Sequence, residues 1–143
     1  MQATQNPYLI VAGMLSALAA LVHLGCVAFG ATWFRYLGAG ERMAKMAATG
    51  HWYPTVAALL IASVLMVWAL YAFSGAGVIP RLPFLRWVLC AITAVYILRG
   101  LAFFVIVPYF PDNSMAFWIA SSCICLAIGL VHLVGLKTAW QQL

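Results

Sequence analysis

Three polar side chains in this apolar sequence have the chemistry to bind an anion or to move a proton: Arg99, His23 and Glu41. Arg99 lies inside the run WVLCAITAVYILRGLAFFVIV, which is long enough to cross a bilayer at about 1.5 Å per helical residue. A cation at that depth costs roughly 2.5–3.5 kcal/mol, and such residues usually face a bundle interior, a water-filled cavity or a partner anion. The chemistry of the sequence therefore depends on what Arg99 contacts.

The elements that must position these side chains are those of a polytopic membrane protein. Of the 143 residues, 67% are hydrophobic and 6% are charged, and the mean hydropathy is +1.08, which excludes an ordinary soluble domain. Four apolar stretches, at residues 8–29, 52–73, 87–107 and 115–136, predict four transmembrane helices. We expect one all-α membrane domain over residues 1–143, a bundle of four transmembrane helices. No basic run or soluble face supports nucleic-acid binding.

The connection between the first two stretches, residues 31–50, is the longest and the least generic. Gly38 and Gly40 interrupt it, and residues 41–48 then have an apolar side. We expect these residues to form a short helix on the membrane surface, with Glu41 paired to Lys45 one turn later. A bundle that needs only a turn uses far fewer residues, so this connection indicates a role at its end of the molecule.

Three- and four-residue spacings place the polar side chains on single helix faces. His23 continues a face of small residues, and Arg99 shares a face with Tyr96. Because the first and third helices run in the same direction, His23 and Arg99 lie in the same half of the bilayer, within about 5–7 Å of its midplane. His132 lies toward the other half. The last helix presents a weakly polar stripe suited to face the bundle: Trp118, Ser122, Cys125, Gly129 and His132.

These positions predict a polar pocket in the half of the bilayer opposite the termini. His23 and Arg99 form its expected floor, and the segment that begins at Glu41 forms its roof. There Arg99 suits an anion, a carbonyl or a lipid phosphate, and His23 suits orientation of the ligand or proton exchange. The candidate ligand-binding residues are Arg99, His23, Glu41, Tyr96, His51, Trp52, Tyr53, Tyr36 and Trp118.

The first functional hypothesis is a membrane protein that binds or transports an amphipathic or anionic small molecule, lipid or quinone-like, with membrane lipids as its partners. The alternative is a structural or accessory subunit of a membrane complex or homo-oligomer, in which Arg99 pins helix-end carbonyls or Glu41. An enzyme would use His23 and Glu41 as acid–base groups. No nucleophile or metal set is evident in the sequence, so enzymatic activity is not expected.

No cofactor is predicted, and b-type haem or a metal is the third hypothesis. Haem bound by two histidines needs both imidazoles at one level on facing helices, but His51 is expected at the surface and His132 in the other half of the bilayer. Cys123 and Cys125 are two positions apart, so on a helix they point to nearly opposite faces and cannot both bind one ion.

Three known classes of small four-helix membrane protein lack support. Disulfide-forming quinone reductases need a C-x-x-C pair, and small multidrug transporters need a carboxylate in the first helix; this sequence has neither. The eicosanoid and glutathione membrane enzymes need polar glutathione-binding residues within their helices, for which Arg99 is the one counterpart here.

A looser resemblance covers about residues 33–100. The segments WFRYLGAGERMAKMA, GHWYP, LYAFSGAGVIPRLPFLR and YILRG together resemble bacterial four-helix inner-membrane proteins of unknown function. The resemblance implies a multi-pass protein of the bacterial inner membrane and no particular activity. Basic residues near the helix ends are equally numerous on the two sides. Those on the side of residues 31–50 share a loop with Glu41, so we expect both termini in the cytoplasm.

Overall fold

In the computed structural model, which describes residues 5–143, helices joined by turns account for the fold, and this range contains no strand. The first four residues of the expected domain lie outside the described residues. The long helices α1, α4 and α7 confirm the helices expected at 8–29, 52–73 and 115–136, with slightly extended ends. The elements in order are α1 (Pro7–Phe29), α2 (Ala31–Tyr36), α3 (Glu41–Ala48), α4 (Trp52–Gly75), α5 (Leu85–Leu101), α6 (Phe103–Ile106), a 3₁₀ turn η1 (Val107–Tyr109) and α7 (Met115–Ala139).

The helix expected at 87–107 is interrupted in the structure. Helix α5 has 17 residues, about 25 Å, and the chain bends by 71° between it and the segment Phe103–Tyr109. Gly100 has a low helix propensity and Pro108 lacks an N–H donor, so neither side of the bend favours a continuous helix. Among the described residues, three helices are long and apolar enough to cross a membrane, or four if the bent segment counts as one span.

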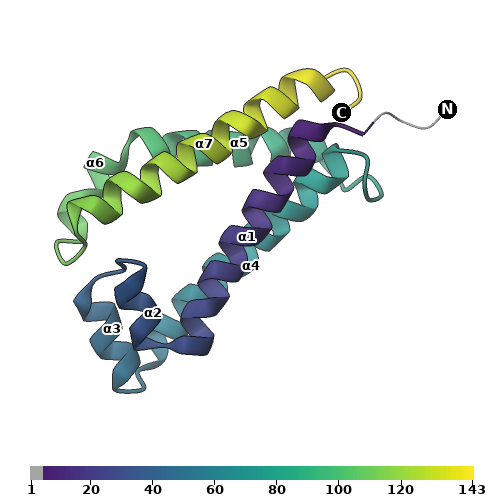
Figure 1. Cartoon of the computed structure of the whole chain (residues 1–143). Helices are drawn as coiled ribbons and strands as arrows, with labels where there is room; N and C mark the ends of the chain where they lie inside the picture. Colours follow the sequence, from purple (N-terminus) through teal and green to yellow (C-terminus); the bar gives the residue numbers. More distant parts are fainter. Residues whose placement is uncertain (1–4) are drawn as a thin grey trace.

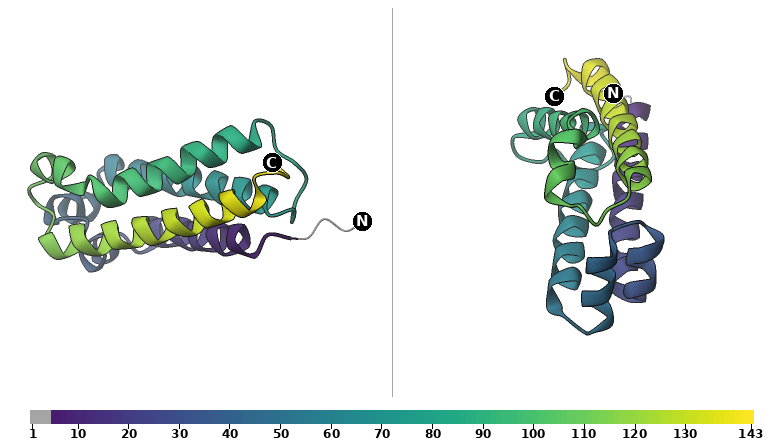
Figure 2. Two further views of the ribbon diagram at one scale, coloured as in Figure 1. Left: turned by 90° about the horizontal axis from the view of Figure 1, so that it is seen from above. Right: turned by 90° about the vertical axis from the view of Figure 1, so that its left-hand side faces the viewer.

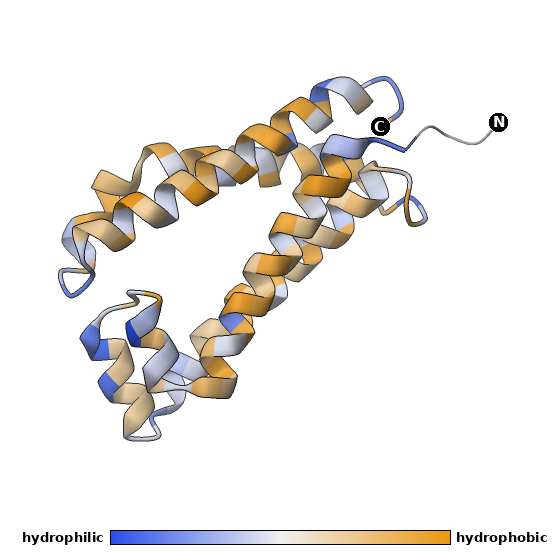
Figure 3. Cartoon of the chain, viewed as in Figure 1, coloured by the Kyte–Doolittle hydropathy of each residue, from blue (hydrophilic) through white to orange (hydrophobic). Residues whose placement is uncertain are grey.

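The long helices form two antiparallel pairs, α1 with α4 and α5 with α7 (Figure 1). The two pairs pack together where the chain ends lie and diverge toward their other ends (Figures 1 and 2). Apolar residues run along both pairs, whereas hydrophilic residues gather at their tips and in α2 and α3 (Figure 3). This distribution is the one that helices in a membrane require.

Small residues and one asparagine hold the two pairs together. A Cβ atom at Gly135 of α7 would lie 2.7 Å from Cγ of Leu9, so α1 and α7 touch closely there. Asn6 caps α1 and reaches across to α7, where its Nδ2 donates to Oγ1 of Thr138 at 2.8 Å and to the carbonyl of Gly135 at 3.2 Å. Helix α7 is therefore fixed to the start of α1.

Helices α2 and α3 cover the tip of the α1–α4 pair. Helix α3 has the bounds expected for the surface helix, and Ala44 on its inner side is buried with Cys26 and Ala58. Gly40 lies in the left-handed region, with φ of 92°, and a Cβ there would lie 2.5 Å from Oδ1 of Asn113. The α2–α3 connection thus needs a glycine at this position, and it lies against the start of α7.

Glu41 has a different partner from the one expected. Nε and Nη2 of Arg35 donate to its two carboxylate oxygens, each at 2.9 Å, so the ion pair joins α2 to α3 instead of linking Glu41 to Lys45. The planar guanidinium matches a carboxylate better than an ammonium does, which favours Arg35. Helix α2 was not predicted, and it is the element that brings Arg35 to Glu41.

The Arg35–Glu41 pair gives a prediction for acid titration. Hydrogen bonds from Arg35 hold the pKa of Glu41 below its ordinary value. A lowered carboxyl pKa stabilises the fold at pH values above the ordinary carboxyl range, and this contribution is lost as the pH falls through the lowered pKa. In a ¹³C NMR titration, Arg35→Gln should move the Glu41 midpoint upward. Arg42→Gln is the control, and an equal shift in both variants would contradict the assigned pair.

Candidate functional site

Arg99 contacts α7 and not the α2–α3 segment. Its Nη1 donates to Oγ of Ser122 at 3.0 Å, its Nη2 donates to Oγ of Ser121 at 3.1 Å, and its Cζ lies 5.2 Å from the ring centroid of Trp118. These three residues lie on consecutive turns near the start of α7. Arg99 therefore joins the two helices of one pair, α5 and α7.

The guanidinium of Arg99 keeps donors to spare. A guanidinium carries five N–H groups, and the hydrogen bonds to the serines use two. The side chain is half-buried, and its Nε, which has no partner in the described residues, is not among their fully buried atoms. The Nε–H group of Arg99 is therefore accessible to a molecule outside the protein.

No carboxylate neutralises Arg99. The sequence has two acidic residues, Glu41 and Asp112. Glu41 is engaged by Arg35, and Asp112 is exposed in the turn before α7. The structural alternative in which Arg99 pairs with Glu41 is therefore not what the structure shows, because Arg35 holds that carboxylate.

His23 is separate from Arg99 in its bonding. Its Nδ1 lies 2.8 Å from the carbonyl oxygen of Ala19, in the same helix, so in the neutral ring Nδ1 carries the proton and Nε2 is the free acceptor. The side chain is half-buried on α1, whereas Arg99 bonds to α7. His23 and Arg99 therefore have different hydrogen-bond partners, although the sequence predicted them at the same depth in the bilayer.

Tyr96 belongs to a second polar cluster, to which each long helix contributes one residue. Its hydroxyl lies 2.9 Å from Oγ of Ser16 in α1, and both residues are buried. Its ring packs against Trp68 of α4 and His132 of α7, with centroid distances of 5.0 and 5.3 Å. This cluster, Ser16–Trp68–Tyr96–His132, lies where the two helix pairs meet and connects them.

His132 is the side chain that the sequence analysis undervalued. It is 0% exposed, its Nδ1 lies 3.0 Å from the carbonyl oxygen of Ile128, and its Nε2 is buried without a hydrogen-bond partner in the described part of the chain. The expected stripe on the last helix is confirmed at Trp118, Ser122 and His132, all buried. The polar stripe therefore indicated that His132 faces the bundle. Its depth, in the other half of the bilayer from Arg99, had excluded it from the predicted pocket.

The remaining candidates lie on the outside of the α1–α4 tip. His51 caps α4, with Nδ1 accepting from the N–H of Tyr53, and its ring stacks on Trp52. Trp52, Tyr53 and Tyr36 are all exposed. His51, Trp52 and Tyr53 form one exposed aromatic group at the end of the molecule that holds α3, and Tyr36 is the last residue of α2. No hydrogen bond in the described residues joins any of the four to Arg99.

Comparison with known proteins returns no match to a family model, to a curated protein or to a solved structure.

Proposed function

We propose that this chain is a multi-pass membrane protein that binds an anionic amphipathic molecule, such as an acidic lipid, through Arg99 in the half of the membrane opposite the termini. In this proposal α5, α6 and η1 together make the third of four spans, in a bacterial inner membrane. The observation that carries the proposal is the bonding of Arg99: hydroxyl and aromatic partners hold it, no carboxylate neutralises it, and donors remain free.

The depth of the guanidinium supports an amphipathic ligand. Ser121 and Ser122 lie six and seven residues after Met115, which is roughly 10 Å along α7. An acidic headgroup reaches that level from the surface while its chains stay in the hydrocarbon. Arg99 is in the last turn of α5, where the helix dipole favours a cation but does not neutralise it.

The bend after α5 also supports a ligand site. The chain breaks its helix at Ala102, directly after the turn that carries Arg99. In membrane proteins, a break in a helix is tolerated where it is buried in protein or lines a cavity, and transporter binding sites are often built at such breaks. Phe104 and Val105 of α6 follow Arg99 closely in the sequence, and their apolar side chains are exposed. These side chains suit contact with acyl chains.

The second candidate is a structural role, favoured by the two serine bonds that already tie Arg99 to α7. The experiment that separates the two titrates purified protein with short-chain phosphatidylglycerol and counts bound lipid by native mass spectrometry. Arg99→Gln should weaken the binding roughly tenfold or more, since a hydrogen bond to a charged group is worth about 1.5–3 kcal/mol.

Arg42→Gln is the matched control, because it removes an exposed cation of α3 from the same end of the molecule. It should leave most of the binding intact. The melting temperature of each variant, from circular dichroism, reports the fold on the same samples. An Arg99→Gln protein that binds the lipid as wild type does but melts earlier would contradict the ligand site and support the structural role.

A further inference from the structure

The imidazole of His132 lies at the interface between the two helix pairs, in the cluster to which each long helix contributes one residue. It is 0% exposed, and its ring packs against that of Tyr96 with a centroid distance of 5.3 Å. Along α7, His132 is ten residues, about 15 Å, from Ser122, to which Arg99 is bonded. His132 is therefore remote from the Arg99 site, and the proposed function makes no use of it.

One ring nitrogen of His132 is bonded and the other is free. Nδ1 lies 3.0 Å from the carbonyl oxygen of Ile128. A carbonyl oxygen can only accept, so Nδ1 carries the hydrogen of the neutral ring. Nε2 then has a free lone pair, and it is buried with no hydrogen-bond partner in the part of the chain that the structure describes. A proton that His132 takes up therefore binds at Nε2.

The side chains around the ring do not balance a positive charge. The titratable groups on its side of α5 and α7 are Tyr96 and Cys125, whose ordinary forms near neutral pH are uncharged. The hydroxyl of Tyr96 is already bonded to Oγ of Ser16, at 2.9 Å. From α1 and α4, Ser16 and Trp68 join the cluster, and neither of these side chains titrates. A protonated His132 therefore has no anionic neighbour in the cluster.

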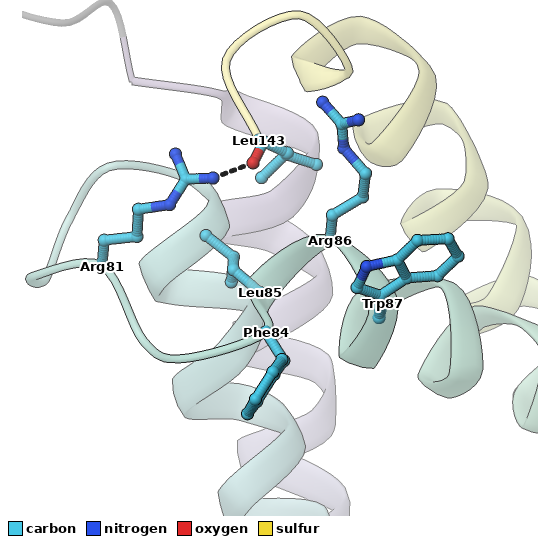
Figure 4. A pocket seen from close by; sticks show the side chains of 6 residues that line it. All are labelled: Arg81, Phe84, Leu85, Arg86, Trp87 and Leu143. Carbon is cyan, nitrogen blue, oxygen red and sulfur yellow. Dashed lines mark hydrogen bonds between the residues drawn. The ribbon is translucent and has the colours of Figure 1, made fainter.

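The charged side chains of the long helices are all positive. Helices α1 and α4 have none, α5 has Arg86 and Arg99, and α7 has Lys137. At the start of α5, Arg86 and the preceding Arg81 donate to backbone oxygens at the end of the sequence (Figure 4). Both acidic residues of the sequence lie in or beside the connections at the far tips of the helix pairs. The helices around His132 thus repel a positive charge on its ring.

A buried charge without a partner is strongly unfavourable while the two pairs are packed together. Separation of the pairs relieves this cost by admitting water, since His132 is seven residues, about 10 Å, from the end of α7 at Ala139. From the burial of the ring, its free Nε2 and the positive charges around it, we propose that His132 is a proton-binding site whose occupation separates the α1–α4 pair from the α5–α7 pair.

The contacts within each pair do not involve His132, so each pair moves as a unit. In the α5–α7 pair, a Cβ at Gly129 would lie 3.0 Å from the N of Ile97. In the α1–α4 pair, a Cβ at Gly13 would lie 2.8 Å from the ring of Phe73. The bonds that oppose separation join the pairs: that of Ser16 with Tyr96 and those of Asn6 with α7.

The direction of the pH dependence follows from the charge of the ring. The packed pairs hold the neutral form and the separated pairs accept the charged form, so a fall in pH favours separation. One linked proton raises the ratio of separated to packed molecules by up to about tenfold for each pH unit. The rise belongs to the range from about pH 8 to about pH 5, in which histidine titrates.

The test measures protonation and distance in the full chain in detergent. NMR of ¹⁵N-labelled histidine follows the ring of His132, because the sequence has three histidines and single substitutions assign their signals. Spin labels at the exposed positions Met14 of α1 and Val95 of α5 report the distance between the pairs, after the four native cysteines are replaced by alanine. This distance should lengthen as His132 takes up its proton. Labels at Met14 and Leu70, both within the α1–α4 pair, are the control and should not move apart.

His132→Phe keeps an aromatic ring against Tyr96 but binds no proton, so the distance between the pairs should stay constant from about pH 8 to about pH 5. His23→Gln and His51→Gln are the matched controls and should separate as wild type does. A wild-type distance that stays fixed, a ring that stays neutral down to about pH 5, or an equal lengthening in His132→Phe would each overturn the proposal. The wild-type titration decides the matter if His132→Phe does not fold. Arg99→Gln should change the pH response little, so this result is independent of the lipid site.

Discussion

Replacement of Gly100 by alanine should force α5 away from α7 and lower the stability of the protein. A Cβ at this position would lie 2.8 Å from Cβ of Leu126, 2.9 Å from its N and 3.0 Å from its Cα. The N and Cα atoms belong to the backbone of α7 and cannot rotate aside. Overpacking of this kind costs about 1–3 kcal/mol and outweighs the gain of up to about 1 kcal/mol from removing a glycine from a helix.

The position of Gly100 next to Arg99 links this substitution to the proposed function. If α5 moves away from α7, the bonds from Arg99 to Ser121 and Ser122 lengthen, so Gly100→Ala should weaken phosphatidylglycerol binding as well as lower the melting temperature. Ala94→Val is the control, because Ala94 is on the exposed side of the same helix. A Gly100→Ala protein that melts at or above the wild-type temperature would show that the close approach of the helices does not limit stability.

Hydropathy and spacing predicted the elements of this fold well because both are local properties. The expected bounds of α3, 41–48, are confirmed, and the structure shows Ser114 as the cap of α7, with its Oγ accepting from the N–H of Phe117. The bend at Ala102 was not predicted, because the length of an apolar run indicates that a segment can cross a membrane but not whether its helix is continuous. Gly100 and Pro108 were the available signals.

The partners of the polar side chains were predicted less well because partner choice depends on which helices pair. The sequence placed Arg99 and His23 at one depth, but Arg99 lies in the α5–α7 pair and His23 in the α1–α4 pair. The same depth argument, applied to α7, which starts at the end of the molecule where α5 ends, would also put Ser121 and Ser122 near the level of Arg99. Residue spacing identified the side of each helix that carries the polar residues. Which helices pack against each other is known only from the structure.

Replacement of Asn6 by alanine should loosen the contact between the two helix pairs. The Oδ1 atom of Asn6 accepts from the N–H of Leu9 at 3.1 Å as the cap of α1, and its Nδ2 makes the two bonds to α7. Loss of the cap costs about 1 kcal/mol and loss of the buried donors about another 1–2 kcal/mol, so Asn6→Ala should destabilise the protein by roughly 2–3 kcal/mol.

Asn6→Ser divides this effect between its two causes. Serine is an equally good cap but cannot reach Thr138, so the serine variant should melt between wild type and Asn6→Ala. Gln5→Ala, at the exposed neighbouring position, is the control. Helical content should change little in all three, because the bonds to α7 join helices and the cap affects only the first turn of α1. A serine variant as stable as wild type would show that the cap alone matters, and that the cluster Ser16–Trp68–Tyr96–His132 is sufficient to hold the two pairs together.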